Sequence, residues 1–295
     1  MKQRLSILFT ALLLAFGPAA RAAEPDWSAV DKVFGSTGKA LPGGVWRWGW
    51  PRTDLNVTIG GVKVEAGLAL DAWAGFLRTG TGEEVMTMGD FVLLDPEVNP
   101  VVSALEGNGL EVTAIHNHLL NETSHVAYLH FSGHGDAVTL AKGLKAALEK
   151  TKTPRASSGA KAEPSAADQA IFKRLQDALG HTGTMAGRIL QVSVPRAEKI
   201  EEHGMEVPVS MSMANPMNFQ VVGDRVATTG DFVLVASEVN PVIRELRAGG
   251  VDVTALHSHM LEESPRLFFM HFWAVDTPEK VGRALKAALS KVHTK

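Results

Sequence analysis

The chain has 295 residues, a formal net charge of −3 and no cysteine. The absence of cysteine excludes disulfides, thiolate catalysis and cysteine-ligated metals. A mildly acidic chain lacks the strongly basic face that attracts a phosphate backbone, so nucleic-acid binding is not expected. Its length is sufficient for one or two hydrophobic cores.

The first 22 residues are typical of a secretory signal peptide. Lys2 and Arg4 precede an apolar run over residues 5–16, and the small residues at 20–22 provide a cleavage site. This run is too short to span a bilayer, and no later stretch has about 18 unbroken apolar residues. We therefore expect an exported protein, periplasmic or secreted, with no transmembrane segment and no lipid-anchored cysteine. Removing Lys2, Arg4 and Arg21 changes the charge from −3 to −6.

A long internal repeat organises the rest of the chain. Residues 89–131 and 230–272 align without a gap, and 21 of the 43 aligned positions are identical. The segment between the repeats is rich in Ser, Ala, Lys and Pro, as in a flexible linker. The predicted organisation is a signal peptide at 1–22, a first repeat unit at 23–150, a linker at 151–166 and a second repeat unit at 167–295.

In chain order, each repeat unit begins with a short helix and then a strand. Residues 28–35 and 171–180 show helical patterns that end at a glycine. Three alternating apolar residues follow in each copy, Trp46, Trp48 and Trp50 in the first and Leu190, Val192 and Val194 in the second. Alternation predicts a strand. The tryptophans are candidates for a sugar-stacking surface, but the aliphatic residues of the second copy favour a core face.

The second helix of each unit is predicted to begin at an Asn-Pro pair and to end at a glycine. Asn99 and Asn240 are good helix caps, and proline fits the first helical turn. Gly109 and Gly250, about ten residues further on, suit a left-handed helix stop.

Two β-rich runs follow this helix, and a third helix ends each unit. In the first copy the runs cover 111–120 and 126–133, which predicts a hairpin with a five-residue loop. The third helices are expected over 136–150 and 277–291. These mostly antiparallel connections predict an α+β fold in which each repeat is a mainly antiparallel sheet with helices packed on one face.

Both copies carry the pattern His-x-His-x-x-x-Glu followed by a third histidine. The candidate metal ligands are His116, His118, Glu122, His130, His257, His259, Glu263 and His271. Imidazoles and a carboxylate together suit a divalent transition metal, namely Zn, Mn, Fe, Ni or Cu. The sequence therefore predicts one such site in each repeat and does not identify the ion.

Strand geometry allows these side chains to meet. Side chains alternate between the two faces of a strand, so His116 and His118 share a face. With a loop over 121–125, His116 is expected opposite His130, with Cβ atoms roughly 4.5–5.5 Å apart. A one-residue slip of register would move His130 to the other face. Glu122 is expected to fold back from the loop over the histidines.

The pattern also resembles the first motif of cupins, which hold a metal in a small β-barrel. A cupin-like β-barrel is therefore the alternative fold. The helices expected directly before the histidine strands do not suit a cupin.

The chain after the signal segment resembles the LppY/LpqO family of bacterial cell-envelope proteins, a family without an assigned biochemical function. The resemblance rests on GDFVL, EVNPV and VTALHSHMLEESPRLFFMHFWA in the second copy. It implies an exported, envelope-associated protein and supplies no catalytic residues. The named members are lipoproteins, and this chain lacks the cysteine that such an anchor needs.

Two functions fit these observations. The first is an exported metal-binding protein, in which an open coordination position would permit metal-dependent catalysis with Glu122 or Glu263 as ligand or general base. The alternative is a non-enzymatic envelope module that binds a glycan, a protein or a small anionic ligand. Arg52 and Arg196 can bind anions, although an acid two residues later favours a local ion pair. The methionines at 205–217 can bind Cu(I), although core filling is favoured.

Overall fold

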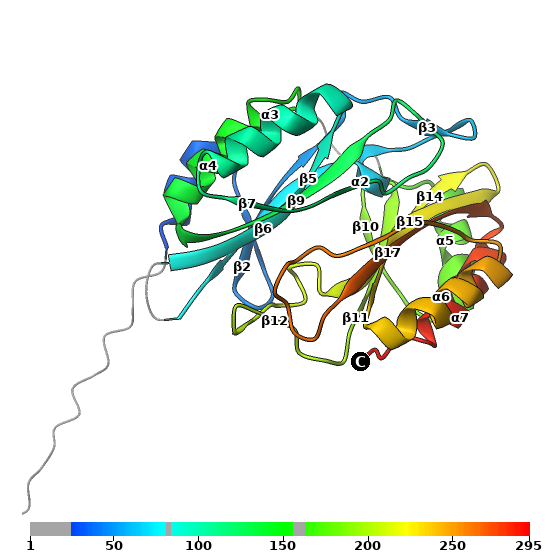
Figure 1. Cartoon of the computed structure of the whole chain (residues 1–295). Helices are drawn as coiled ribbons and strands as arrows, with labels where there is room; N and C mark the ends of the chain where they lie inside the picture. The colour runs from blue at the N-terminus through cyan, green and yellow to red at the C-terminus, as the bar shows by residue number, and fades with distance from the viewer. Residues whose placement is uncertain (1–24, 81–83, 156–162) are drawn as a thin grey trace, which may run out of the picture.

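The structure, a computed structural model, describes residues 25–80, 84–155 and 163–295. The predicted signal peptide at 1–22 lies outside the described residues, as does the middle of the predicted linker at 151–166. The described chain forms four layers, with two six-stranded sheets face to face in the middle and helices on their outer faces (Figure 1).

The first repeat contains α1 (Trp27–Phe34), β1 (Lys39–Leu41), β2 (Val45–Pro51), β3 (Thr58–Ile59), β4 (Val62–Lys63), α2 (Ala66–Ala69), β5 (Asp71–Arg78), β6 (Glu84–Leu93), α3 (Asp95–Glu106), β7 (Glu111–His116), β8 (Glu122–Thr123), β9 (Ala127–Asp136) and α4 (Ala137–Leu148). The second repeat contains α5 (Ala166–Leu179), β10 (Thr184–Ala186), β11 (Ile189–Pro195), β12 (Glu201–Glu202), β13 (Met205–Glu206), β14 (Ala214–Val222), β15 (Arg225–Leu234), α6 (Ala236–Ala248), β16 (Asp252–His257), β17 (Phe268–Asp276) and α7 (Pro278–Leu289).

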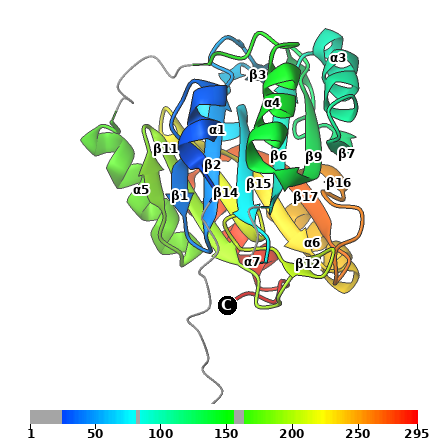
Figure 2. The same ribbon diagram turned by 90° about the vertical axis from the view of Figure 1, so that its left-hand side faces the viewer.

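The two large sheets have the same topology. Their strand orders are β1-β2-β5-β6-β9-β7 and β10-β11-β14-β15-β17-β16. Every neighbouring pair in them is antiparallel. The helices α1, α3 and α4 lie across the outer face of the first sheet (Figure 2). The predicted α+β fold of two similar units is confirmed. The cupin-like alternative is wrong, because both sheets are open and neither closes into a barrel.

Both faces of the central strands are buried, which explains their continuous apolar sequences. On β6, Phe91 and Leu93 pack against the helices, whereas Met86 and Met88 face the other sheet. The inner layer joins residues of both repeats, such as Met88 with Phe269. The two sheets therefore share a core, and the repeats are held together by apolar burial.

The second helix of each repeat begins earlier than predicted. α3 begins at Asp95, and Pro100 lies inside it. The backbone N–H of Leu94 donates to the Glu97 carboxylate at 2.9 Å and so satisfies a free amide of the first turn. The predicted start at Asn99 was wrong because the cap provided by Glu97 begins the helix four residues earlier, at Asp95. This cap outweighs the helical hydrogen bond that Pro100 removes. Gly109 follows the helix with a φ of 74°, as a left-handed stop requires.

Two buried arginines fix these helix starts to the sheets. Arg52 is fully buried and its guanidinium donates to Glu97 at 2.8 Å and Asp54 at 3.0 Å. Arg196 is 1% exposed and its guanidinium donates to Glu238 at 2.6 Å. The same pairing in both repeats identifies these arginines as structural ion pairs, not as sites for an anionic ligand.

The tryptophans of β2 belong to the core. Trp48 and Trp50 are each 1% exposed, and the Trp48 indole N–H donates to Asp31 at 2.9 Å. Trp46 stacks on Trp27 with ring centroids 5.6 Å apart. The strand therefore offers no sugar-stacking surface.

Methionines of the 205–217 run are also buried, with Met211 and Met217 fully so. This confirms their expected role as core fillers.

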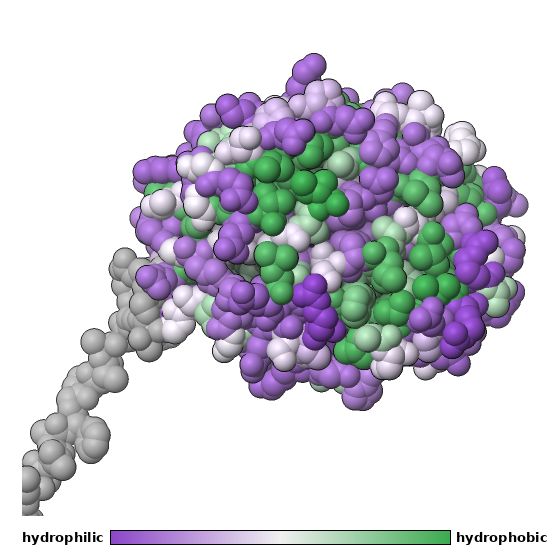
Figure 3. Space-filling model, in the orientation of Figure 1, coloured by the Kyte–Doolittle hydropathy of each residue, from purple (hydrophilic) through white to green (hydrophobic). Residues whose placement is uncertain are grey.

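Hydrophobic residues gather in areas between hydrophilic ones on the face shown in Figure 3. The large apolar side chains with high exposure include two equivalent pairs, Ile115 with Leu256 and Leu120 with Leu261. These segments adjoin β7 and β16, which lie next to each other. Among the helices of the described ranges, none has the length and apolar composition that crossing a membrane requires.

Candidate metal centre

All six histidines of the repeated pattern lie in one cluster between the two sheets. The three shortest distances between their ring centroids join the two repeats: 3.5 Å for His116–His257, 3.5 Å for His118–His271 and 3.8 Å for His130–His259. Each pair combines residues about 140 positions apart in the sequence. The two sites predicted from the sequence, one in each repeat, therefore merge into one shared cluster.

Candidate ligand atoms converge in four overlapping groups, within each of which they lie within 4.8 Å of one another. The groups are His116, His130, His257 and His259; His116, His118 and His271; Asp90, His118 and His130; and Asp231, His259 and His271. The first two groups cross between the repeats, whereas the last two are equivalent sets within each repeat. Because His118, His130, His259 and His271 each belong to two groups, the groups form a connected set of donors.

The strand register that positions these histidines differs from the predicted one by two residues. His116 lies opposite Tyr128, and Ala114 lies opposite His130, next to an irregularity between Val112 and Ala114. A shift of two residues preserves the face of the sheet. His116 and His130 therefore still share the inner face, with ring centroids 5.0 Å apart. The expected direct opposition of His116 and His130 was wrong.

The connection between these strands is also longer than the predicted five-residue loop. β7 ends at His116 and β9 begins at Ala127. Between them, β8 leaves the hairpin and pairs with β3 in a separate three-stranded sheet. This separate pairing takes Glu122 away from the histidines.

Glu122 and Glu263, the predicted carboxylate ligands, do not join the convergent groups among the described residues. Glu263 accepts the backbone N–H of Leu267 at 2.9 Å and a bond from Arg266 at 3.2 Å. Glu122 lies 3.7 Å from the ring of His125. Both carboxylates therefore interact within the connection between the two histidine strands of their own repeat.

Asp90 and Asp231 are the carboxylates that the structure brings to the cluster, and the sequence analysis missed them. Asp90 on β6 lies opposite His130, and Asp231 on β15 lies opposite His271. Both belong to the repeated GDFVL segment. The available signal was an acid kept at the same place in both copies, on a strand that is otherwise apolar.

The ring of one histidine in each half lies between two aromatic neighbours. His118 stacks on Tyr128 at 3.6 Å and on His271 at 3.5 Å. Its equivalent, His259, stacks on Phe269 at 3.5 Å and on His130 at 3.8 Å. Tight stacking fixes the ring planes without using the ring nitrogens.

In two of the histidines, the ring nitrogen Nδ1 contacts an oxygen of the protein. His271 Nδ1 contacts the Gly230 carbonyl at 3.2 Å and the Asp231 carboxylate. His116 Nδ1 contacts the Asn117 carbonyl at 3.2 Å. Such contacts at Nδ1 orient an imidazole so that Nε2 faces a ligand.

The Nε2 atoms of all six histidines are buried and have no hydrogen-bond partner. A buried nitrogen without a partner costs about 1–3 kcal/mol, so unpaired groups are uncommon in protein interiors. Six such nitrogens in one cluster require a common explanation. Metal coordination within the convergent groups would satisfy such nitrogens, and the donor set therefore fits a transition metal.

Burial favours the neutral imidazole in His116, His118, His130, His257 and His259. Burial lowers the pKa of His130 to about 4 and that of His257 to about 2, and neighbouring histidines contribute to both. The pKa values of His118 and His259 lie well below the usual range for the same reasons. Neutral imidazole is the form that binds metals, so no proton must leave at neutral pH.

The pKa of Asp90 is raised, whereas the pKa values of these histidines are lowered. Burial, followed by the charge of Asp231, raises its pKa well above the ordinary value, while Arg47 acts against this rise. A bound cation would remove this penalty by stabilising the carboxylate.

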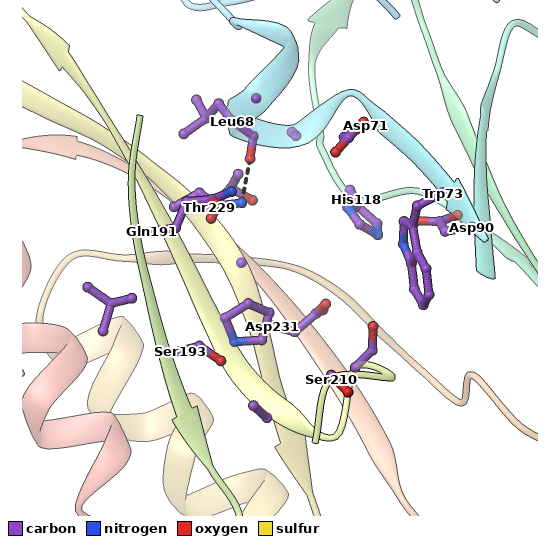
Figure 4. A pocket seen from close by; sticks show the side chains of 18 of the residues that line it. Leu68, Asp71, Trp73, Asp90, His118, Gln191, Ser193, Ser210, Thr229 and Asp231 are labelled. Atoms are coloured by element: carbon purple, nitrogen blue, oxygen red, sulfur yellow. Dashed lines mark hydrogen bonds between the residues drawn. The ribbon is translucent and has the colours of Figure 1, made fainter. Parts of the chain in front are cut away.

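A cavity of about 340 Å³ reaches the cluster from between the repeats. Asp71, Trp73, Asp90 and His118 lie on one side of it, and Gln191, Ser193, Thr229 and Asp231 lie on the other (Figure 4). A volume above 300 Å³ is within the range of small-molecule sites. The histidine cluster is therefore accessible to a small ligand.

One solved structure, described as the crystal structure of a trimeric bacterial microcompartment shell protein PduB, resembles this chain at 12% sequence identity. The resemblance covers 86% of this chain and 89% of that one, with a TM-score of 0.22 that supports no conclusion. No curated protein matches the chain. The resemblance to the LppY/LpqO family stays a prediction. A family model described as Domain of Unknown Function (DUF1259) matches residues 28–150 and 173–291, one match for each repeat. The chain therefore belongs to this family, as a tandem of two of its domains.

Proposed function

We propose that this protein is an exported metal-binding protein whose two repeats jointly hold a divalent transition metal. The observation that supports this function is the cluster of six buried imidazoles whose Nε2 atoms have no hydrogen-bond partner. Export is supported by the basic, apolar and small-residue pattern of residues 1–22.

The donor chemistry narrows the class of ion. Mg²⁺ and Ca²⁺ are bound through oxygen ligands, whereas six imidazoles provide nitrogen donors suited to Zn, Fe, Ni, Cu or Mn. Asp90 and Asp231 add one carboxylate on each side of the cluster. Asp90 and Asp231 thereby take the ligand role that the sequence assigned to Glu122 and Glu263.

The cavity supports metal-dependent catalysis as the finer form of this function. His118, His130 and His259 line the cavity and also belong to the convergent groups. A small molecule in the cavity would therefore meet the bound ion directly. The ion would supply Lewis-acid chemistry, and Asp90 or Asp231 would be positioned to accept a proton.

Exposed tryptophans on the first strand would favour the envelope-module alternative, whereas Trp48 and Trp50 are buried against the helices. We therefore propose no glycan-binding surface.

Metal content measured by mass spectrometry on untagged protein tests the proposal. We expect stoichiometric metal in the wild type and nearly none in either H116A/H118A or H257A/H259A, because the groups share ligands across the repeats. The variant H181A, which alters a histidine after α5, serves as the control and should retain its metal. Absence of metal from wild-type protein, even after reloading with each candidate ion, would overturn the proposal.

A further inference from the structure

The walls of the cavity break the symmetry of the two repeats. Arg47 on β2 pairs with Gly75, and Gln191 on β11 pairs with Asn218 at the equivalent place. The first repeat thus presents a cation where the second presents a neutral amide. A ligand in this cavity meets two chemically different walls.

At two more positions of the cavity wall, the first repeat has an aromatic or charged residue where the second has a neutral aliphatic one. Trp73 lies opposite Gly49, whereas Pro216 lies opposite Ser193 in the second repeat. Asp71, opposite Pro51, has the counterpart Ala214. Apart from the residues of the metal cluster, the charged and aromatic groups that line the cavity all come from the first repeat.

Arg47 presents a fixed guanidinium to the cavity. Its guanidinium lies 4.0 Å above the ring of Trp73, which fixes the plane of the fork. Burial lowers its pKa, and the charges of Asp71 and Asp90 oppose this effect. Arginine remains protonated in proteins, and its planar fork binds a carboxylate through two hydrogen bonds.

The opposite wall provides neutral hydrogen-bonding groups. Gln191, Ser193 and Asn218 line it, together with Thr229, whose equivalent in the first repeat is Met88. Thr229 is 2% exposed, and its hydroxyl has no hydrogen-bond partner. A buried hydroxyl without a partner beside a cavity indicates a ligand group that completes it. Hydroxyls and amides of this kind bind the hydroxyl groups of a ligand.

We propose that the cavity binds a small hydroxylated carboxylate, of the sugar-acid type, between the two repeats. The carboxylate pairs with Arg47, the hydroxyl groups bond to the wall that includes Thr229, and the ligand extends toward the histidine cluster. This inference rests on the proposed metal centre, because the ion would supply positive charge beside Asp90 at the end of the cavity that faces the histidines.

Calorimetric titration of the metal-loaded protein tests the ligand class. The probes are D-gluconate, its neutral analogue sorbitol, and succinate, which has carboxylates without hydroxyls. We expect gluconate to bind, sorbitol to bind at least about 10-fold more weakly, and succinate to bind more weakly than gluconate. Equal affinities for gluconate and sorbitol would overturn the role of Arg47, and equal affinities for gluconate and succinate would overturn that of the neutral wall.

Matched variants test the charged wall and the neutral wall of the cavity separately. R47Q removes the cation and should weaken gluconate binding about 10- to 100-fold, as expected for the loss of a charged hydrogen-bonded pair. K199Q removes an exposed positive charge outside the cavity and should bind like the wild type. T229V should weaken gluconate but leave succinate unchanged. Circular dichroism of each variant separates loss of binding from loss of folding.

Metal content measured on the same samples, before and after titration, separates the two proposals. Protein that holds metal but binds no gluconate would overturn the ligand class and leave the metal centre standing. Protein that holds no metal would overturn the metal centre itself, and with it the inference that depends on it.

Discussion

The rings of His116 and His257 lie face to face with their centroids 3.5 Å apart, although 141 residues separate them in the chain. They are equivalent residues of the two repeats. Their contact places the centre of the histidine cluster at the join between the repeats, so each half of the protein provides only part of the donor set.

His257 belongs to a group of candidate ligands drawn from both repeats, so its removal should weaken metal binding by the whole cluster. H257A removes a nitrogen from the four-histidine group that spans both repeats. We expect the metal content of the protein to fall by much more than half, as measured by mass spectrometry after dialysis. H293A, which alters an exposed histidine paired with Glu198, is the control. A loss of half the metal would instead indicate two independent sites.

The lowered pKa values of the histidines predict that the metal-free protein loses stability in mild acid. His130 has a pKa of about 4 in the folded protein, against about 6.5 when it is exposed on unfolding. Between pH 6.5 and about 4, His130 therefore binds a proton in the unfolded chain but not in the folded chain. The stability present above pH 6.5 should fall between pH 6.5 and 4, by on the order of 3 kcal/mol from His130 alone.

Urea denaturation in the presence of a chelator, at pH 7.5, 6 and 5, measures this dependence. H130N should show a shallower decline than the wild type over the same interval. Identical pH profiles for the two proteins would contradict the assignment.

The buried arginine pairs predict a large cost for removing one partner. E97A removes one of the two carboxylates that contact the fully buried Arg52 guanidinium and leaves only Asp54 beside it. We expect the free energy of unfolding to fall by about 3–5 kcal/mol. E279A breaks an exposed ion pair with Arg174 and should cost far less, because water screens exposed charges. Chemical denaturation of both variants tests the contrast, which similar losses would refute.

Gly89 is required where two strands and a ring approach closely. A Cβ atom there would lie 2.1 Å from the Trp73 carbonyl oxygen and 2.5 Å from the Phe131 ring. G89A must displace backbone, so we expect at least about 1–3 kcal/mol of destabilisation and weaker metal binding through the adjacent Asp90. G204A, at a turn with open space, is a control for conformational strain alone. Wild-type melting and metal content in G89A would contradict this expectation.

Much of the fold was determined locally and was therefore predictable from the sequence. The repeat predicted two similar units, and the glycine at 109 marked a helix stop because a left-handed backbone favours glycine. Because side chains alternate along a strand, the sequence correctly placed His116 and His130 on one face. The predicted register was wrong by two residues, and a shift of two residues leaves the face unchanged. The start of α3 was missed because a distant partner, Arg52, holds the Glu97 cap.

The repeated motif also identified the six histidines as a set, since imidazoles repeated at fixed spacing have few purely structural uses. Only the tertiary structure decided which of them meet. Stacking of the two sheets joins His118 to His271, and pairing of β6 with β9 brings Asp90 to His130. The pairing of β8 with β3 carries Glu122 away. Alternation along a strand fixes the face on which a side chain lies, but the packing of whole sheets fixes what that face meets.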